Sequence, residues 1–255
     1  MAGNFVQLHN HTHYSLLDGA SKVPDLVKRV KELGMPAVGI TEHGNMHGAY
    51  ELWRAAVDSG VKPIIGIEAY VTPETARQDK TRVSWDTNWT PVPGHARNPD
   101  DVSGGGLITH LTMWAENDEG LVNLIKASSV ANLEGRVMRY PRMDKEVLST
   151  YSKGVIASSG CPSGIIQTRL RLGQFDEALR AAGEFQDIFG KDNFYIELMD
   201  HGLSIESKVT GDLLTIAKKL GAPLLATNDS HYVMEADTTW RPVMLESRSL
   251  IIRTT

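Results

Sequence analysis

The sequence lacks several features that would each point to a particular class of protein. It contains a single cysteine, Cys161, so no disulfide can form within the chain. No apolar run approaches the ~18 residues that a membrane-spanning helix needs. The polar residues 1–8 also lack the apolar stretch of a signal peptide. These absences predict a cytoplasmic protein that does not contact a membrane.

Basic residues are not in excess either. The chain has 26 Lys and Arg against 31 Asp and Glu, which gives a formal net charge of -5. Composition therefore does not indicate the broad basic surface that drives nonspecific binding to nucleic acids. Low-complexity runs are also absent, which excludes wholesale disorder. With 255 residues, of which 41% are hydrophobic, the chain favours one large α/β domain with a single core.

What the sequence does contain is an alternation of strand-like and helix-like segments. Short apolar runs predict seven strands at 5–8, 37–41, 63–71, 107–114, 154–158, 194–198 and 223–227. Helical spacing of apolar residues lies between most of them, at 21–33, 49–57, 119–133, 163–189 and 204–220. Strict alternation predicts parallel strands joined by right-handed crossovers, arranged as a barrel or as an open doubly wound sheet. No glycine-rich dinucleotide fingerprint follows any of the strands.

One long segment interrupts this alternation. Residues 72–106 are rich in Pro, Gly, Asp and Asn, contain Trp85 and Trp89, and end in three glycines. We interpret them as an insertion, and a loop of this length is usually either functional or disordered. The two tryptophans are expected to fasten it to the domain.

Side chains that bind metals occur near the ends of most predicted strands. In a barrel the reacting groups come from the carboxyl ends of many different strands, so chemistry is expected there. Six of the seven strands bring such residues: His9, His11, Asp18, His43, Glu68, His110, Cys161, Asp229 and His231.

The spacing within this set favours metal binding. Residues i and i+2 of an extended segment point to the same side, so His9 with His11, and Asp229 with His231, can address one centre. A single histidine is more often a satisfied core residue, and a single cysteine is more often a small buried hydrophobe. Such a role does not account for nine residues at equivalent positions.

The number and type of these residues also indicate the chemistry. Nine exceed the four ligands of one tetrahedral zinc, which predicts two or three metals. Imidazoles and carboxylates suit zinc, iron and manganese, and one thiolate favours zinc or iron. Such ions ionise water near neutral pH and stabilise the negative charge that develops on a phosphoryl group. Hydrolysis of phosphate esters is therefore the predicted reaction.

Other polar residues are weaker candidates. Asp200 and His201 follow the sixth strand, where they could orient a ligand, donate a proton to a leaving oxygen or serve an ordinary structural role. Glu42 adjoins His43 but is expected to face the opposite way. A cluster of three arginines suits either a DNA backbone or, by preference, a solvated loop: Arg136, Arg139 and Arg142.

The motifs around the nine residues resemble a known family. They are Leu8-His9-Asn10-His11-Thr12, Tyr14-Ser15-Leu16-Leu17-Asp18-Gly19, Thr41-Glu42-His43-Gly44, Gly66-Ile67-Glu68-Ala69-Tyr70, Gly160-Cys161-Pro162 and Asn228-Asp229-Ser230-His231-Tyr232. Together they resemble the PHP (polymerase and histidinol phosphatase) domain of bacterial DNA polymerase III alpha subunits, in detail the actinobacterial type. The resemblance runs over about residues 4–233.

This resemblance implies a fold and a function. The fold would be a distorted seven-stranded, TIM-like (β/α)7 barrel. The nine residues would be both the metal ligands and the catalytic centre for three divalent metals, most commonly zinc, with manganese or iron as alternatives. The activity would be 3′–5′ exonuclease proofreading at a DNA 3′ end, with other replication proteins as partners.

Two departures from the family are visible. His13 stands where relatives often have an acidic or polar residue, and we expect it at the rim of the site. Residues 234–255 do not align with the family, and the polymerase domains that follow in relatives are absent from this sequence. The domain is therefore expected to cover residues 1–233 and not to polymerise DNA by itself.

Two alternative functions stay open. One is a small-molecule phosphatase of the histidinol-phosphatase type, although residues 14–19 and 197–202 favour the polymerase branch. The other is a structural or docking module whose metals only stabilise the fold. The complete ligand set disfavours this second alternative, because fewer ligands would be enough to stabilise a domain.

Overall fold

The computed structural model describes residues 5–16, 18–86, 88, 90, 98, 100–101, 105–234 and 236–237. The chain divides into two compact units. The first unit is Met1–Ile67 together with Asn228–Thr255, and the second unit is Glu68–Thr227. Trp89 and most of the unaligned tail, 238–255, lie outside the described residues. No helix in the described part of the chain is both long enough and apolar enough to cross a membrane.

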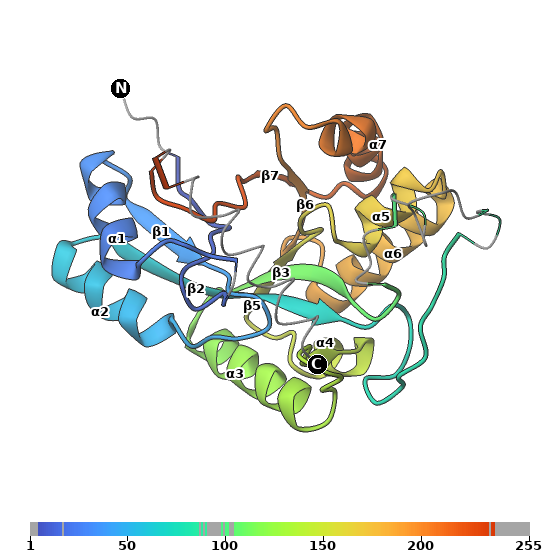
Figure 1. The fold of residues 1–255 in the computed structure, drawn as a ribbon, viewed down its shortest axis with the longest axis horizontal. Helices are drawn as coiled ribbons and strands as arrows, with labels where there is room; N and C mark the ends of the chain where they lie inside the picture. The colour runs from blue at the N-terminus through green and yellow to red at the C-terminus, as the bar shows by residue number, and fades with distance from the viewer. Residues whose placement is uncertain are drawn as a thin grey trace. The chain divides into compact units, whose positions relative to one another are not determined.

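The first unit is a small α/β layer. Its elements are α1 (Val23–Glu32), β1 (Ala37–Ile40), α2 (Ala49–Ser59) and the start of β2 (Lys62–Val71). The two strands are parallel, with Ala37 opposite Lys62. Figure 1 shows α1 and α2 beside this pair, where their apolar faces form one buried cluster. The 3.6-residue spacing of α1 explains this burial, because it places Leu26, Val27 and Val30 on one face.

The segment predicted as the first strand does not form a regular strand. Gln7 makes only an isolated parallel bridge to Val38, and Asn10 makes another to Ser230. The Asn10 side chain donates to the Gly39 carbonyl at 2.8 Å, so a side-chain amide takes a backbone acceptor that a ladder would have used. The segment nevertheless runs beside β1, because the Gly39 N–H donates to the Gln7 carbonyl at 2.7 Å.

The described residues of the second unit form the rest of the sheet and five helices. Its strands are the end of β2, β3 (Thr109–Ala115), β4 (Arg142–Met143), β5 (Val155–Ser158), β6 (Phe194–Leu198) and β7 (Leu224–Ala226). The hydrogen-bonded order is β2-β3-β5-β6-β7, and β4 pairs with the end of β2. Its helices are α3 (Asp118–Leu133), α4 (Lys145–Thr150), α5 (Ile165–Arg171), α6 (Phe175–Phe189) and α7 (Ser204–Leu220). In Figure 1, α5, α6 and α7 lie together beside β6.

One strand runs against the predicted direction. Strand β3 pairs antiparallel with β5, with Thr112 opposite Ser158, so the expectation of an all-parallel sheet is wrong at this point. A parallel crossover needs a connection that packs on the sheet, usually a helix. The connection from β2 to β3 is the 72–106 insertion, which has no helix among its described residues. The antiparallel direction places the start of β3 beside the end of β5.

The insertion is attached to the second unit. Trp85 is 7% exposed, the guanidinium of Arg169 lies 4.3 Å from its ring centroid, and its carbonyl accepts from Gln174 at 2.7 Å. This confirms the fastening role expected of Trp85. Arg142 is fully buried, whereas Arg136 and Arg139 are exposed, so the three arginines do not form one basic surface.

Candidate metal centre

Six of the nine predicted ligands belong to the first unit. His9 and His11 lie on the segment beside β1, Asp18 follows in a turn, and His43 comes after the end of β1. Asp229 and His231 lie on the returning segment that bridges to Asn10 through Ser230. His9 and His11 are fully buried, and His231 is 7% exposed. Buried imidazoles in this number need polar partners.

Asp229 gathers three of these imidazoles. Its Oδ1 atom lies 3.4 Å from His9 Nε2, 3.1 Å from His11 Nε2 and 3.6 Å from His231 Nδ1. His9 and His11 therefore face the same side, as their i, i+2 spacing predicted. Asp229 has a φ of 44°, a left-handed conformation in which Asp is one of the better-tolerated residues.

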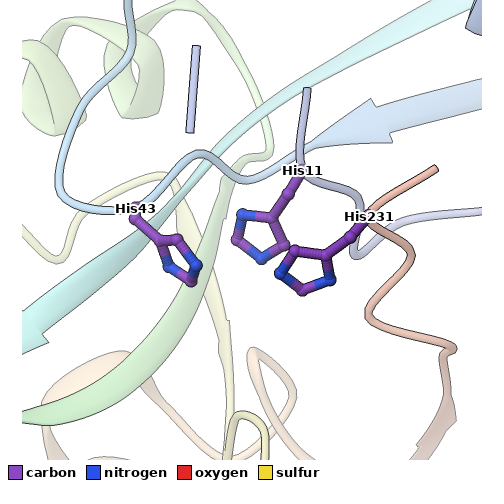
Figure 2. A group of neighbouring side chains, drawn as sticks. All are labelled: His11, His43 and His231. Carbon is purple, nitrogen blue, oxygen red and sulfur yellow. The ribbon is translucent and has the colours of Figure 1, made fainter. Parts of the chain in front are cut away.

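Three imidazoles lie close together beside this carboxylate. Figure 2 shows His11 between His43 and His231, and their ring centroids are 4.0 Å and 4.5 Å from that of His11. The ligand atoms of these three residues all lie within 4.8 Å of one another, and so do those of His9, His11 and Asp229. Ligands bound to a common metal at about 2.0–2.2 Å are separated by similar distances. The donor types and spacing therefore suit a divalent metal.

Asp18 provides the second carboxylate of the first unit. Its Oδ2 atom lies 3.0 Å from His43 Nε2 and 3.7 Å from His231 Nε2. Burial alone would raise the pKa of Asp18, but the neighbouring imidazoles of His231 and His43 outweigh it and hold the pKa well below its ordinary value. Asp18 is therefore ionised at neutral pH and can balance cationic charge.

Glu42 lies among these residues and contacts the segment that carries His11. Its side chain is fully buried and accepts hydrogen bonds from the Thr12 N–H, the Thr12 hydroxyl and the Ser15 hydroxyl. Glu42 does not face away from the site as expected, because β1 ends at Ile40 and the alternation of an extended strand ends with it. A carboxylate directly before a candidate ligand in the sequence is the signal that could have identified Glu42.

The other three predicted ligands meet in the second unit. His110 Nδ1 lies 3.1 Å from Glu68 Oε2 and 3.5 Å from Cys161 Sγ. The antiparallel direction of β3 explains this meeting, because it places His110, the second residue of β3, beside the loop that follows β5. The His110 N–H donates to the Ser163 carbonyl of that loop at 3.0 Å. Imidazole, carboxylate and thiolate together are a donor set typical of zinc or iron.

The weaker candidates lie apart from these groups. The side chain of His13 is 42% exposed and its Nδ1 lies 3.3 Å from the Ser21 carbonyl, in agreement with a position at the rim. His201 is paired with Glu206 in the second unit. Asp200 Oδ1 accepts from the Gly202 N–H at 3.2 Å, as in a tight turn.

Comparisons with known proteins agree with the motifs. Residues 7–201 match the family model described as PHP domain. The DNA polymerase III subunit alpha of Mycobacterium leprae is 52% identical over 230 residues, covering 90% of this chain and 19% of that protein. The corresponding protein of Saccharopolyspora erythraea is 54% identical over 229 residues, with the same coverage. The chain thus spans about a fifth of the length of these relatives, and the predicted resemblance to the actinobacterial type is confirmed.

A solved structure supports the fold. An amidohydrolase from Chromobacterium violaceum, with bound sulfate and no metal, matches with a TM-score of 0.51 and 14% identity, covering 89% of this chain and 87% of that chain. At this identity the likeness concerns the fold alone. With the family match, it confirms the predicted α/β, TIM-like class, apart from the direction of β3.

Proposed function

The chain belongs to the PHP domain family, and on that premise we propose that it is a metal-dependent phosphoesterase. The observation that carries the proposal is the gathering of four imidazoles and two carboxylates in the first unit, with Asp229 Oδ1 within 3.1–3.6 Å of three imidazole rings. Two buried histidines would need fewer polar side chains than these to satisfy their hydrogen bonds. The nine residues that we assign as ligands and catalytic centre are His9, His11, Asp18, His43, Glu68, His110, Cys161, Asp229 and His231.

The residues of this chain would divide the work in the following way. Divalent cations held here would supply positive charge that stabilises a phosphoryl transition state and favours ionisation of a water. Asp18 orients the rings of His43 and His231. Ser15 contacts the ring of His11, and Glu42 accepts the Ser15 proton and so fixes that hydroxyl. Zinc is the metal we propose, because Cys161 adds a soft ligand; manganese and iron are the alternatives.

We further propose that the substrate is the 3′ end of a DNA strand. The support is the 52–54% identity to proteins named DNA polymerase III subunit alpha, together with the complete set of nine ligand residues. Hydrolysis would release one nucleotide at a time in the 3′–5′ direction, as a proofreading activity, and replication proteins would be the partners. Histidinol phosphate is the matched small-molecule alternative.

The test combines metal content with a pair of substrates. Purified chain is analysed for metals and then incubated with 3′-labelled single-stranded DNA and, separately, with histidinol phosphate. We expect two or three metals per chain, release of labelled nucleotide and no action on histidinol phosphate. His9→Ala should abolish release, while His47→Ala, a substitution of an exposed histidine, should not.

Each other outcome has a defined meaning. If the chain binds metals but hydrolyses only histidinol phosphate, its substrate is a small phosphate ester and not DNA. Metals with neither activity would favour a structural module, particularly if chelation lowers the melting temperature. A chain without metal after purification and after reloading with zinc or manganese would overturn the proposal.

A further inference from the structure

His201, which follows β6, and Glu206, in the first turn of α7, form a hydrogen-bonded pair. Nδ1 of the His201 ring lies 2.5 Å from Glu206 Oε1, and the backbone N–H of His201 donates to Glu206 Oε2 at 2.8 Å. The Glu206 side chain is 7% exposed, whereas that of His201 is 36% exposed. A buried carboxylate thus fixes the direction of an imidazole that still reaches solvent. This is the arrangement by which carboxylates orient catalytic histidines.

The pair lies at the same edge of the sheet as a predicted ligand. Strands β5 and β6 are parallel neighbours, with Ala157 opposite Phe194, so the loops after both strands leave the same edge. Cys161 is in the first of these loops and His201 is in the second. A cavity of about 20 Å³ is lined by Gly160, Cys161 and Pro162 of the first loop, by Leu198 and Met199 at the end of β6, and by Glu206 of α7.

Helix capping alone explains only part of this geometry. Glu206 is the third residue of α7, and a glutamate there often accepts a backbone N–H from the residues that precede the helix. The His201 N–H fills that role through Oε2. The contact of the imidazole with Oε1 is additional, and it commits a second carboxylate oxygen to the ring.

We propose that His201, oriented by Glu206, is the proton donor to the leaving oxygen in phosphate-ester hydrolysis; this inference rests on the proposed function. The oxygen of a water adds to phosphorus and keeps one of its protons, while the other proton passes to solvent, which reprotonates His201 after the reaction. The bond from phosphorus to the ester oxygen breaks. The leaving oxygen keeps the electron pair of that bond and takes the proton from His201 Nε2, so that an alcohol departs. The negative charge of Glu206 stabilises the imidazolium that gives this proton. The end of β6 supplies none of the nine proposed ligands, so this role does not compete with metal binding.

The test compares two substrates that differ in the need for a proton. The 3′ oxygen of a DNA strand is a poor leaving group, whereas p-nitrophenolate leaves from thymidine 5′-p-nitrophenyl phosphate without protonation. We expect His201→Gln to slow nucleotide release from DNA by about 100-fold and to slow the p-nitrophenyl ester by no more than about threefold. Glu206→Gln should show the same pattern at about tenfold on DNA. The descending alkaline limb of the pH profile on DNA should also disappear in His201→Gln.

Controls separate this role from a structural one. Both variants should keep the metal content and melting temperature of the natural chain, and His47→Ala should keep both activities. Equal losses on the two substrates, or no loss on either, would overturn the role of His201 and leave the proposed function in place. A natural chain that hydrolyses neither substrate when loaded with metal would overturn the proposed function and this inference together.

Discussion

Ser15 Oγ lies 2.9 Å from Nδ1 of His11. The same hydroxyl donates its only proton to Glu42 and accepts the His43 N–H at 3.2 Å. Because the Ser15 proton is committed to Glu42, the contact with His11 requires the ring proton to be on Nδ1. The lone pair of His11 is then on Nε2, 3.1 Å from Asp229 Oδ1. Two acceptor atoms at this distance repel unless a proton or a metal cation lies between them.

We call the contacts from Glu42 through Ser15 to His11 a relay. This relay predicts that Ser15→Ala weakens metal binding without removing a ligand. The variant would lose the acceptor that fixes the His11 tautomer, and outer contacts of this kind are typically worth 10–100-fold in metal affinity. We expect the zinc dissociation constant, measured by competition with a chromophoric chelator, to rise by about that factor. Ser129→Ala is the matched control, because Ser129 is exposed and its hydroxyl bonds only within α3. Equal affinities in the two variants would mean that the relay does not act on the metal.

The sequence indicates candidate ligands more directly than the contacts that support them. The nine proposed ligands were named from their motifs and from positions near the ends of predicted strands, although Glu68 lies within β2 and His110 lies near the start of β3. The i, i+2 rule correctly placed His9 and His11 on one side. The same rule gives the wrong direction for Glu42, because β1 ends at Ile40. Alternation is a property of extended strands, and the end of a four-residue strand is difficult to locate from sequence.

Most elements of the fold were predicted, but residues 5–8 do not form a regular strand and not all strand directions were predicted. Helices α1, α3 and α7 match the expected ranges to within two residues, since their apolar residues repeat every 3.6 positions. Strand β4 was missed because two residues carry no periodic signal. The direction of β3 was also wrong, because an apolar strand has the same pattern in parallel and antiparallel pairing. A connection without a helix, such as 72–106, was the available warning.

A second prediction concerns the buried guanidinium of Arg142. It donates to four backbone carbonyls, two of which belong to the insertion: Gly135 at 3.2 Å, Leu107 at 3.3 Å, Arg77 at 2.7 Å and Asp79 at 2.7 Å. A lysine ammonium cannot reproduce this planar fork and would leave buried carbonyls without donors. We expect Arg142→Lys to lower the free energy of unfolding by about 3 kcal/mol, measured by urea denaturation.

The neighbouring arginine provides the control. Arg139 is exposed and lies over the ring of Tyr140 at 5.1 Å, so Arg139→Lys should change the free energy of unfolding by no more than about 0.5 kcal/mol. If both arginines served a DNA backbone, the two variants would weaken DNA binding equally and leave stability unchanged. That outcome would contradict a structural role for Arg142.

A third prediction concerns the acid sensitivity of Asp144. Burial alone would raise the pKa of Asp144, but backbone hydrogen bonds from Val147 and Arg77 and the charge of Arg77 outweigh it and lower the pKa. A pKa that is lower in the folded chain than the ordinary value of about 4 gives stability above that pH, which is lost as the pH falls through the folded value. Asp144→Asn should therefore lower the free energy of unfolding by about 2 kcal/mol at pH 7.

In urea denaturation at a series of pH values, this difference should shrink steadily below about pH 4. Asp58→Asn, at a carboxylate that is 67% exposed, should stay within about 0.5 kcal/mol of the natural chain throughout. A gap for Asp144→Asn that is as large at pH 3 as at pH 7 would show that the ionised carboxylate contributes nothing to stability.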